Sequence, residues 1–366
     1  MAKLLGSPKA LSLTIIVAAV FVVSILGGAL GNAFGLGFLA SSLPAIQLPA
    51  EVITKGFLTP VGQWDLMNTM VTTWLAMIVL IAAAVFVRVG LKEVPGRIQA
   101  LFELIIEFFI TLCESVAGKE KARRFFPLVF TIFIFIVVAN WMGILPGFGT
   151  IGRVADPSEI AHHHGVHEYA DPAQSGVAQD SQTDHGTSHG ASEEDGARSD
   201  HLSSVKLHVF NGSGRLAVLS PGSLNDELTF SEYEEVHGDL GVGRRAGHLV
   251  PFLRSANTDV NMTLAMALVA MVMVHYWGFS ILGAFGHAGK FINVKEGPIG
   301  FFVGILELIS ELARVISFTF RLFGNIFAGE VLLMAMGFLL PLVGIIPFLG
   351  LELFVGLIQA FIFAML

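Results

Sequence analysis

Long apolar segments without charge constrain this chain more than any other feature of its sequence. A helix needs about 20 apolar residues to cross the hydrocarbon core of a bilayer. Four segments of about this length or more contain no Asp, Glu, Lys or Arg: 11–30, 66–87, 125–151 and 260–286. Because backbone groups in lipid must hydrogen-bond internally, these segments predict a bundle of membrane-spanning helices.

The last apolar stretch, residues 299–366, differs because it carries charged side chains. Its length predicts two long helices with a break near Pro341 or Pro347. The expected fold class is an all-α polytopic membrane protein with about four transmembrane helices and two long tilted membrane helices. The charged residues of the stretch are Glu307, Glu311, Arg314, Arg321, Glu330 and Glu352.

Composition excludes several other classes of protein. Hydrophobic residues make up 54% and charged residues 14% of the chain, against about 45–50% and about 25% in soluble domains. Residues 151–250 hold 6 Lys and Arg but 16 Asp and Glu, so the acidity of the chain belongs to this one segment. A soluble enzyme and a nucleic-acid partner are therefore not expected. The single cysteine, Cys113, excludes an intrachain disulfide.

The short loops predict the orientation in the membrane. Residues 88–124 carry seven Lys and Arg, and 287–298 carry two, whereas 31–65 contain only Lys55. The two basic loops should face the cytoplasm, or the matrix in an organelle, and the acidic segment should lie on the opposite side. The expected regions are an N-terminal apolar segment, membrane helices with a cytoplasmic interfacial helix, an acidic external insert and membrane channel helices: 1–31, 60–149, 150–250 and 251–366.

Two segments leave alternatives open. Residues 1–31 are typical of a retained helix because of their apolar length, but their lysines and small residues also resemble a cleaved signal peptide. Glu103, Glu107 and Glu114 share one face of a predicted helix in the inner loop. That pattern favours a helix at the membrane interface over a further short span, which would bury three carboxylates.

The insert is polar and rich in Gly, Ser and Asp over residues 162–200, which predicts a mobile stretch without a core. Residues 203–220 alternate in polarity around Asn211-Gly212 and predict a β-hairpin. The insert holds ten of the twelve histidines, with His162, His163, His164 and His167 closest together. Metal capture is one interpretation. We favour adventitious binding instead, since nothing in the local sequence fixes a coordination geometry, and we expect neither a metal site nor a cofactor.

Arg321 is the charge that the sequence explains least. Its neighbours three and four positions away are Phe318, Gly324, Ser317 and Asn325, none of which is a carboxylate. Glu330 lies nine positions on, which is about the opposite face of a helix with 3.6 residues per turn. By contrast, Glu311 and Arg314 can pair within one helix. Arg321 therefore requires an anion from another helix or another subunit.

Three further polar groups follow Arg321: Glu330, Glu352 and Gln359. Glu352 and Gln359 are seven positions apart and share a helical face. Buried carboxyl groups can hold and release protons, so this set is typical of a proton relay. The structural alternative is a pair of protonated carboxyl groups bonded to the backbone.

The run SFTFRLFGNIFAGEVLL, followed by LIQAFIFAML, resembles the a subunit of F-type ATP synthases. VPGRIQALFELIIEFF, PLVFTIFIFIVVANWMGILPG and RSANTDVNMTLAMALV support the resemblance in the expected order, over residues 60–149 and 250–366. The insert and the first apolar segment are additions. This chain also has glutamate at both Glu330 and Glu352, where many relatives have one histidine.

The resemblance implies roles for individual residues. The arginine matching Arg321 faces the carboxylate of the rotor ring, and residues matching Glu330, Glu352 and Gln359 line aqueous half-channels. The residues that match Asn325, Ser317 and Glu307 lie along the same path. The two long helices would then face a ring of c subunits.

By this resemblance, the chain is a proton-translocating stator subunit that catalyses no reaction by itself. Its implied partners are the c ring, the peripheral stalk b subunits, the rest of the ATP synthase and the lipid bilayer. The expected location is the bacterial inner membrane, with an organellar inner membrane as the alternative. A secondary transporter would show related halves, which are not visible here. An outer-face metal-binding protein is the other alternative.

Overall fold

We analysed a computed structural model of the chain. The structure describes these residues: 8–32, 50–59, 62–145, 147–163, 205–212, 216–218, 227–236, 238, 240–241, 243–291 and 297–366. The polar stretch that the sequence predicts to be mobile lies outside these residues, except for its first two histidines.

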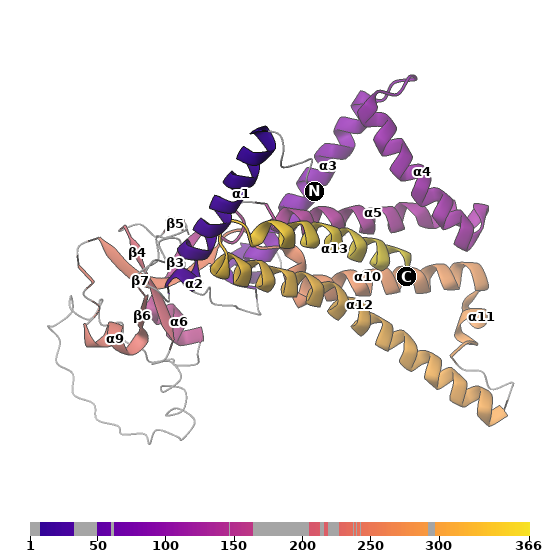
Figure 1. The fold of residues 1–366 in the computed structure, drawn as a ribbon. Coiled ribbons are helices and arrows are strands. Elements are labelled where there is room, and N and C mark those ends of the chain that lie inside the picture. Colours follow the sequence, from indigo (N-terminus) through magenta and orange to yellow (C-terminus); the bar gives the residue numbers. More distant parts are fainter. Residues whose placement is uncertain are drawn as a thin grey trace, which may run out of the picture.

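The described residues form a helical bundle with a small sheet at one end (Figure 1). Within the described residues, five helices are long and apolar enough to cross a membrane: α1 (Pro8–Gly27), α3 (Asn68–Gly90), α5 (Lys119–Gly143), α10 (Val260–Leu282) and α13 (Ile345–Met365). The other helices are α2 (Ala29–Asn32), α4 (Arg97–Ala117), α6 (Pro157–His163), α9 (Phe230–Glu235), α11 (Ala284–Ala288) and α12 (Gly297–Leu339), with a 3₁₀ turn at Ala256–Thr258. The predicted all-α polytopic fold is confirmed.

The two predicted long helices are α12 and α13. At 43 residues, α12 is about 65 Å long at 1.5 Å per residue, so it must tilt or extend beyond a hydrocarbon core of about 30 Å. The break between the helices falls at residues 340–344, around Pro341. Pro347 instead lies in the first turn of α13, where proline is tolerated because its missing N–H would have no partner.

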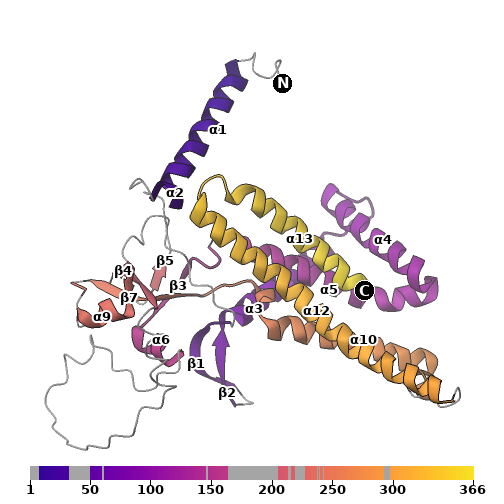
Figure 2. The same cartoon turned by 60° about the horizontal axis from the view of Figure 1, so that its bottom comes forward.

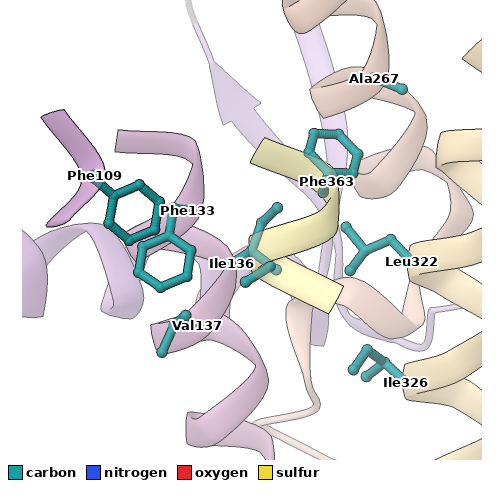
Figure 3. Packing of buried hydrophobic residues seen from close by; sticks show 9 residues of the cluster. Phe109, Phe133, Ile136, Val137, Ala267, Leu322, Ile326 and Phe363 are labelled. Carbon is teal, nitrogen blue, oxygen red and sulfur yellow. The ribbon is translucent and has the colours of Figure 1, made fainter. Parts of the chain in front are cut away.

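The core of the bundle joins α4, α5, α10, α12 and α13 (Figure 3). Phe109 of α4 packs against Phe133 of α5, with ring centroids 4.3 Å apart. Leu322 and Ile326 reach the same core from α12, and Phe363 reaches it from α13. These contacts bury one face of α12 and thereby fix which of its other faces point outward.

The N-terminal helix touches the bundle through its C-terminal end. Ser24 is fully buried, and its Oγ accepts hydrogen bonds from the backbone N–H groups of Leu342 and Val343 at 3.2 and 3.3 Å. Figure 2 shows α2 close to the turn between α12 and α13, while most of α1 projects away. The side chains along the rest of α1 are mostly exposed and apolar, as suits contact with lipid.

The insert forms a five-stranded sheet in the order β5-β3-β7-β4-β6. The paired strands are antiparallel. Helices α6 and α9 contribute to a hydrophobic core that includes Ile160, Leu207, Phe230 and Tyr233. The strands are β3 (Ile151–Ala155), β4 (Lys206–Asn211), β5 (Leu216–Val218), β6 (Glu227–Thr229) and β7 (Arg244–Pro251).

The predicted hairpin is wrong in its pairing, although both of its strands form. Strand β4 pairs with β6 and β7, and β5 pairs with β3. The four central residues of β4 are all buried, so this strand occupies an interior position of the sheet. The short β5 exposes Leu216 and Val218 and lies at the edge. The turn at Asn211-Gly212 therefore leads away from β4 to a strand at the other edge.

A second, unpredicted hairpin connects the N-terminal part of the chain to α3. It consists of β1 (Val52–Thr59) and β2 (Gly62–Met67), which pair antiparallel. Figure 2 shows this hairpin between the sheet and the helical bundle. The α4–α5 turn and α11 lie at the end of the bundle away from the sheet (Figure 1). This separation agrees with the predicted placement of the insert opposite the basic loops.

Candidate functional site

Arg321 lies on an outward face of α12, and its side chain is exposed. Its Nη2 donates a hydrogen bond to Ser317 Oγ at 3.4 Å. Among the described residues, no carboxylate forms an ion pair with Arg321. The prediction that its own helix supplies no anion is confirmed, and no other described helix supplies one either.

The same face of α12 carries the other polar residues that precede Arg321. Positions spaced by three, four and seven along a helix share a face; here they include Glu307, Arg314 and Ser317, all exposed. Arg314 Nη1 donates to Glu311 Oε2 at 3.0 Å, which confirms the predicted pair within the helix. The helix therefore presents two outward guanidinium groups, of which Arg314 has a carboxylate partner.

Glu330 lies further along α12, toward its C-terminal end. It forms an ion pair that sequence reasoning missed. Arg254 Nε and Nη2 each donate to the Glu330 carboxylate at 3.2 Å. The Arg254 residue is 6% exposed. Arg254 belongs to the segment RSANTDVN, but nothing in its local spacing links it to a residue 76 positions away.

Glu352 of α13 is buried and lies against Gly329, beside Glu330. A Cβ atom at Gly329 would collide with the Glu352 carboxylate, so glycine lets that carboxylate lie directly against the α12 backbone. Glu352 also interacts electrostatically with Glu330. The structure thus brings together the two carboxylates that the sequence predicts as a relay.

The pairing of α12 with α13 sets the level of Gln359 along α12. Glu352 lies against Gly329, and the tilted rings of Phe318 and Phe363 have centroids 5.4 Å apart. These two contacts fix one antiparallel register, in which Gln359 is level with Leu322. Gln359 and Asn325 are partly buried, and no hydrogen bond joins either side chain to another described residue.

Further buried polar residues lie near the ends of α3, α5 and α10 and were not predicted. Asn140 Nδ2 donates to the Gly356 carbonyl at 3.1 Å, and Asn257 Nδ2 donates to Asn140 Oδ1 at 2.6 Å. Thr69 Oγ1 donates to Asp259 Oδ2 at 3.1 Å. Since asparagine and threonine are common in ordinary helices and turns, only the three-dimensional packing distinguishes these residues.

The described residues contain no group of three or more His, Cys, Asp or Glu side chains that could hold a metal ion. Most of the His-rich stretch, including His164 and His167, lies outside the described residues. The interpretation of that stretch therefore stays a prediction.

The fold and these side chains define a polytopic membrane protein with carboxyl, amide and guanidinium groups along one pair of long helices. The sequence profile of the family described as ATP synthase A chain matches residues 70–163 and 239–366. The chain belongs to this family, and it is therefore a subunit of the membrane sector of ATP synthase.

Individual relatives agree with the family. Proteins named ATP synthase subunit a include one from Mycobacterium bovis, 27% identical over 304 residues that cover 82% of this chain and 83% of the relative. One from Desulforamulus reducens is 40% identical over 126 residues, 32% of this chain and 46% of the relative. Hahella chejuensis has one, ATP synthase subunit a 1, that is 25% identical over 326 residues, 86% of this chain and 88% of the relative.

Proposed function

We propose that this chain forms two offset proton half-channels and presents Arg321 to a carboxylate of the rotor ring between them. The observation that carries the proposal is the exposed guanidinium of Arg321 on a long apolar helix, without a carboxylate partner among the described residues. Placing such a charge in hydrocarbon costs about 2.5–3.5 kcal/mol on insertion scales. A rotor carboxylate would compensate this charge.

In the outer half-channel, Glu330 and Glu352 would carry protons from the outer solution toward the rotor. The position of the Glu352 carboxylate against Gly329, the residue before Glu330, supports this role, because proton transfer requires neighbouring groups. Arg254 would hold the Glu330 carboxylate in position. Gln359 would line the path near Arg321, at the level where α13 passes Leu322.

In the inner half-channel, Ser317 and Glu307 would line the way from the rotor to the inner solution, with Asn325 on the other side of Arg321. Ser317 and Glu307 lie on the exposed face of α12 that leads away from the sheet end of the bundle. Ser317 also contacts Arg321 directly. The two paths would thus approach Arg321 from opposite ends of α12 without meeting.

Arg321 would act as a fixed positive charge and not as a proton carrier. Guanidinium stays protonated at accessible pH. Its field lowers the pKa of a carboxylate within roughly 4–6 Å and so promotes proton release from the rotor. The same charge opposes direct passage of protons between the half-channels. The implied partners are the c ring and the peripheral stalk b subunits, in a bacterial inner membrane.

The proposal predicts that Arg321→Lys abolishes proton-driven ATP synthesis. Lysine keeps a charge, but it loses the planar fork of arginine and can deprotonate when buried. The measurement is ATP synthesis by assembled complexes in liposomes under an imposed potential. Arg314→Lys is the matched control, since Arg314 lies seven positions earlier on the same face, and this variant should work like the parent. Near-parent synthesis by Arg321→Lys would refute the proposed role.

A further inference from the structure

Glu51 directly precedes β1. Figure 2 shows the β1–β2 hairpin between the sheet and the helical bundle. The Glu51 carboxylate Oε2 accepts a hydrogen bond from Asn68 Nδ2 at 3.2 Å, and the Glu51 backbone carbonyl accepts one from the Asn68 N–H at 3.1 Å. Asn68 is fully buried and also donates to the Pro251 carbonyl at the end of the sheet. These bonds fix the Glu51 carboxylate at the sheet end of α3.

The two guanidinium groups that act on Glu51 each have a carboxylate partner of their own. Arg254 pairs with Glu330 at 3.2 Å, and Arg153 pairs with Glu159 at 2.7 Å. Arg153 also donates to the carbonyl of Val52, the residue after Glu51. Among the described residues, Glu51 forms no ion pair. Both arginines that act on Glu51 are therefore already paired with another carboxylate.

The surroundings of Glu51 make its protonation respond to pH near neutrality. Burial of the carboxyl group raises the pKa of Glu51 to about 7. The neighbouring Glu330 carboxylate also raises this pKa, whereas Arg254, Arg153 and the hydrogen bond from Asn68 lower it. The Glu51 residue as a whole is partly exposed, so it lies at the surface of the described structure beside the hairpin.

We propose that Glu51 is the outermost proton-binding group of the outer half-channel, where it collects protons from solution and passes them to the Glu330–Glu352 pair. The inference rests on the proposed function of the chain. In each transfer the Glu51 carboxylate takes a proton from the outer solution, then gives it up toward Glu330 and becomes anionic again. Glu51 lies outside the residues that the family profile matches, so family membership assigns it no role.

The test varies the outer pH in liposomes containing the assembled complex, with the inner pH and the membrane potential fixed. Glu51→Gln keeps the shape of the side chain and an oxygen that can accept from Asn68, but it cannot bind a proton. A group with a pKa of about 7 goes from about nine-tenths protonated at pH 6 to about one-tenth at pH 8. The parent rate of ATP synthesis should therefore saturate below an outer pH of about 7.

In Glu51→Gln the inner carboxylates must take protons directly from solution, so the rate should keep rising as the pH falls to 6. The rate of ATP synthesis by the variant, divided by that of the parent, should then decrease about tenfold between outer pH 6 and 8. This decrease follows the protonation of the Glu51 carboxyl group, which the variant lacks. Glu51→Asp keeps a titratable carboxyl group and should retain saturation. Glu159→Gln removes a nearby carboxylate that is already paired and should follow the parent profile.

Two results would overturn the inference. One is a Glu51→Gln profile that saturates like the parent. The other is a rate reduced by the same factor at every pH, which would indicate that Glu51 only supports the hairpin. Arg321→Lys in the same assay separates this inference from the function on which it rests. If Arg321→Lys fails and Glu51→Gln follows the parent, only the role of Glu51 is wrong.

Discussion

At the scale of single residues, two guanidinium groups of this chain have opposite surroundings. Arg254 is buried and bonded to Glu330, whereas Arg321 is exposed and lacks a carboxylate among the described residues. Removing one member of a buried pair costs about 3–5 kcal/mol, since it leaves an uncompensated charge. Arg254 is therefore suited to hold Glu330 in place, and Arg321 is suited to meet a carboxylate that arrives from outside the chain.

Glu352→Gln should slow proton conduction about tenfold or more, because an amide cannot bind and release a proton. The loss should grow as the outer pH rises and protons become scarce. Glu330→Gln should also slow conduction, but it breaks the pair with Arg254. The double change Glu330→Gln with Arg254→Gln removes both charges, and it should recover assembly without recovering conduction. Proton flux under an imposed potential measures each effect.

Glu352→His provides the control for this relay. Imidazole titrates near neutral pH and can relay protons, so this variant should keep more flux than Glu352→Gln. Should the two Gln variants, singly and together, conduct like the parent, the carboxylates would have no part in the path.

At the scale of elements, the sequence predicts the helices, breaks and strands that depend on a local pattern of residues. Apolar length predicts the spanning helices, and Pro341 predicts the break between α12 and α13. Alternating polarity predicts strands on both sides of Asn211-Gly212. The pairing of these strands depends instead on which strand the sheet buries, and β4 is an interior strand. The β1–β2 hairpin was missed, although Pro60 and Gly62 between two apolar runs are typical of a turn.

In the candidate site, too, features set by local sequence could be predicted, and contacts between distant segments could not. The missing partner of Arg321 could be predicted, because its helical neighbours are three and four positions away. The Arg254–Glu330 pair and the contact of Glu352 with Gly329 join distant parts of the chain. Such contacts arise from packing between helices, so no spacing within one helix reveals them.

The sheet suggests a direct test of whether the insert takes part in coupling. Strands β3 and β7 are antiparallel neighbours with Ala155 opposite His248. Deleting residues 156–247 and joining these two residues through Asn-Gly should therefore close a short hairpin without disturbing the bundle. We expect near-parent ATP synthesis, since the proposed half-channels use no residue of the deleted segment. Normal assembly with complete loss of coupling would place the insert in the proton path.

At the scale of the whole molecule, the proposed proton path runs between the two ends of the bundle. Asn68 joins Glu51 to Pro251 at the end of the sheet. Helix α12 runs toward the sheet from the side of α11 (Figure 1). Glu330 and Glu352 would lead protons inward to the level of Arg321, and Glu307 would lead them out along the other part of α12. A potential of 100 mV supplies about 2.3 kcal/mol per charge, and this energy drives rotation only if protons cannot bypass the rotor.

The most direct test of this account is the Arg321→Ala complex, reconstituted in liposomes under an imposed potential. Both ATP synthesis and passive proton flux through the membrane sector are measured, with the amount of assembled complex as the control. Without the fixed charge, the two half-channels lose their barrier, so we predict no ATP synthesis together with a passive proton leak larger than that of the parent. An assembled Arg321→Ala complex that makes ATP at near-parent rates, without added leak, would contradict the central claim.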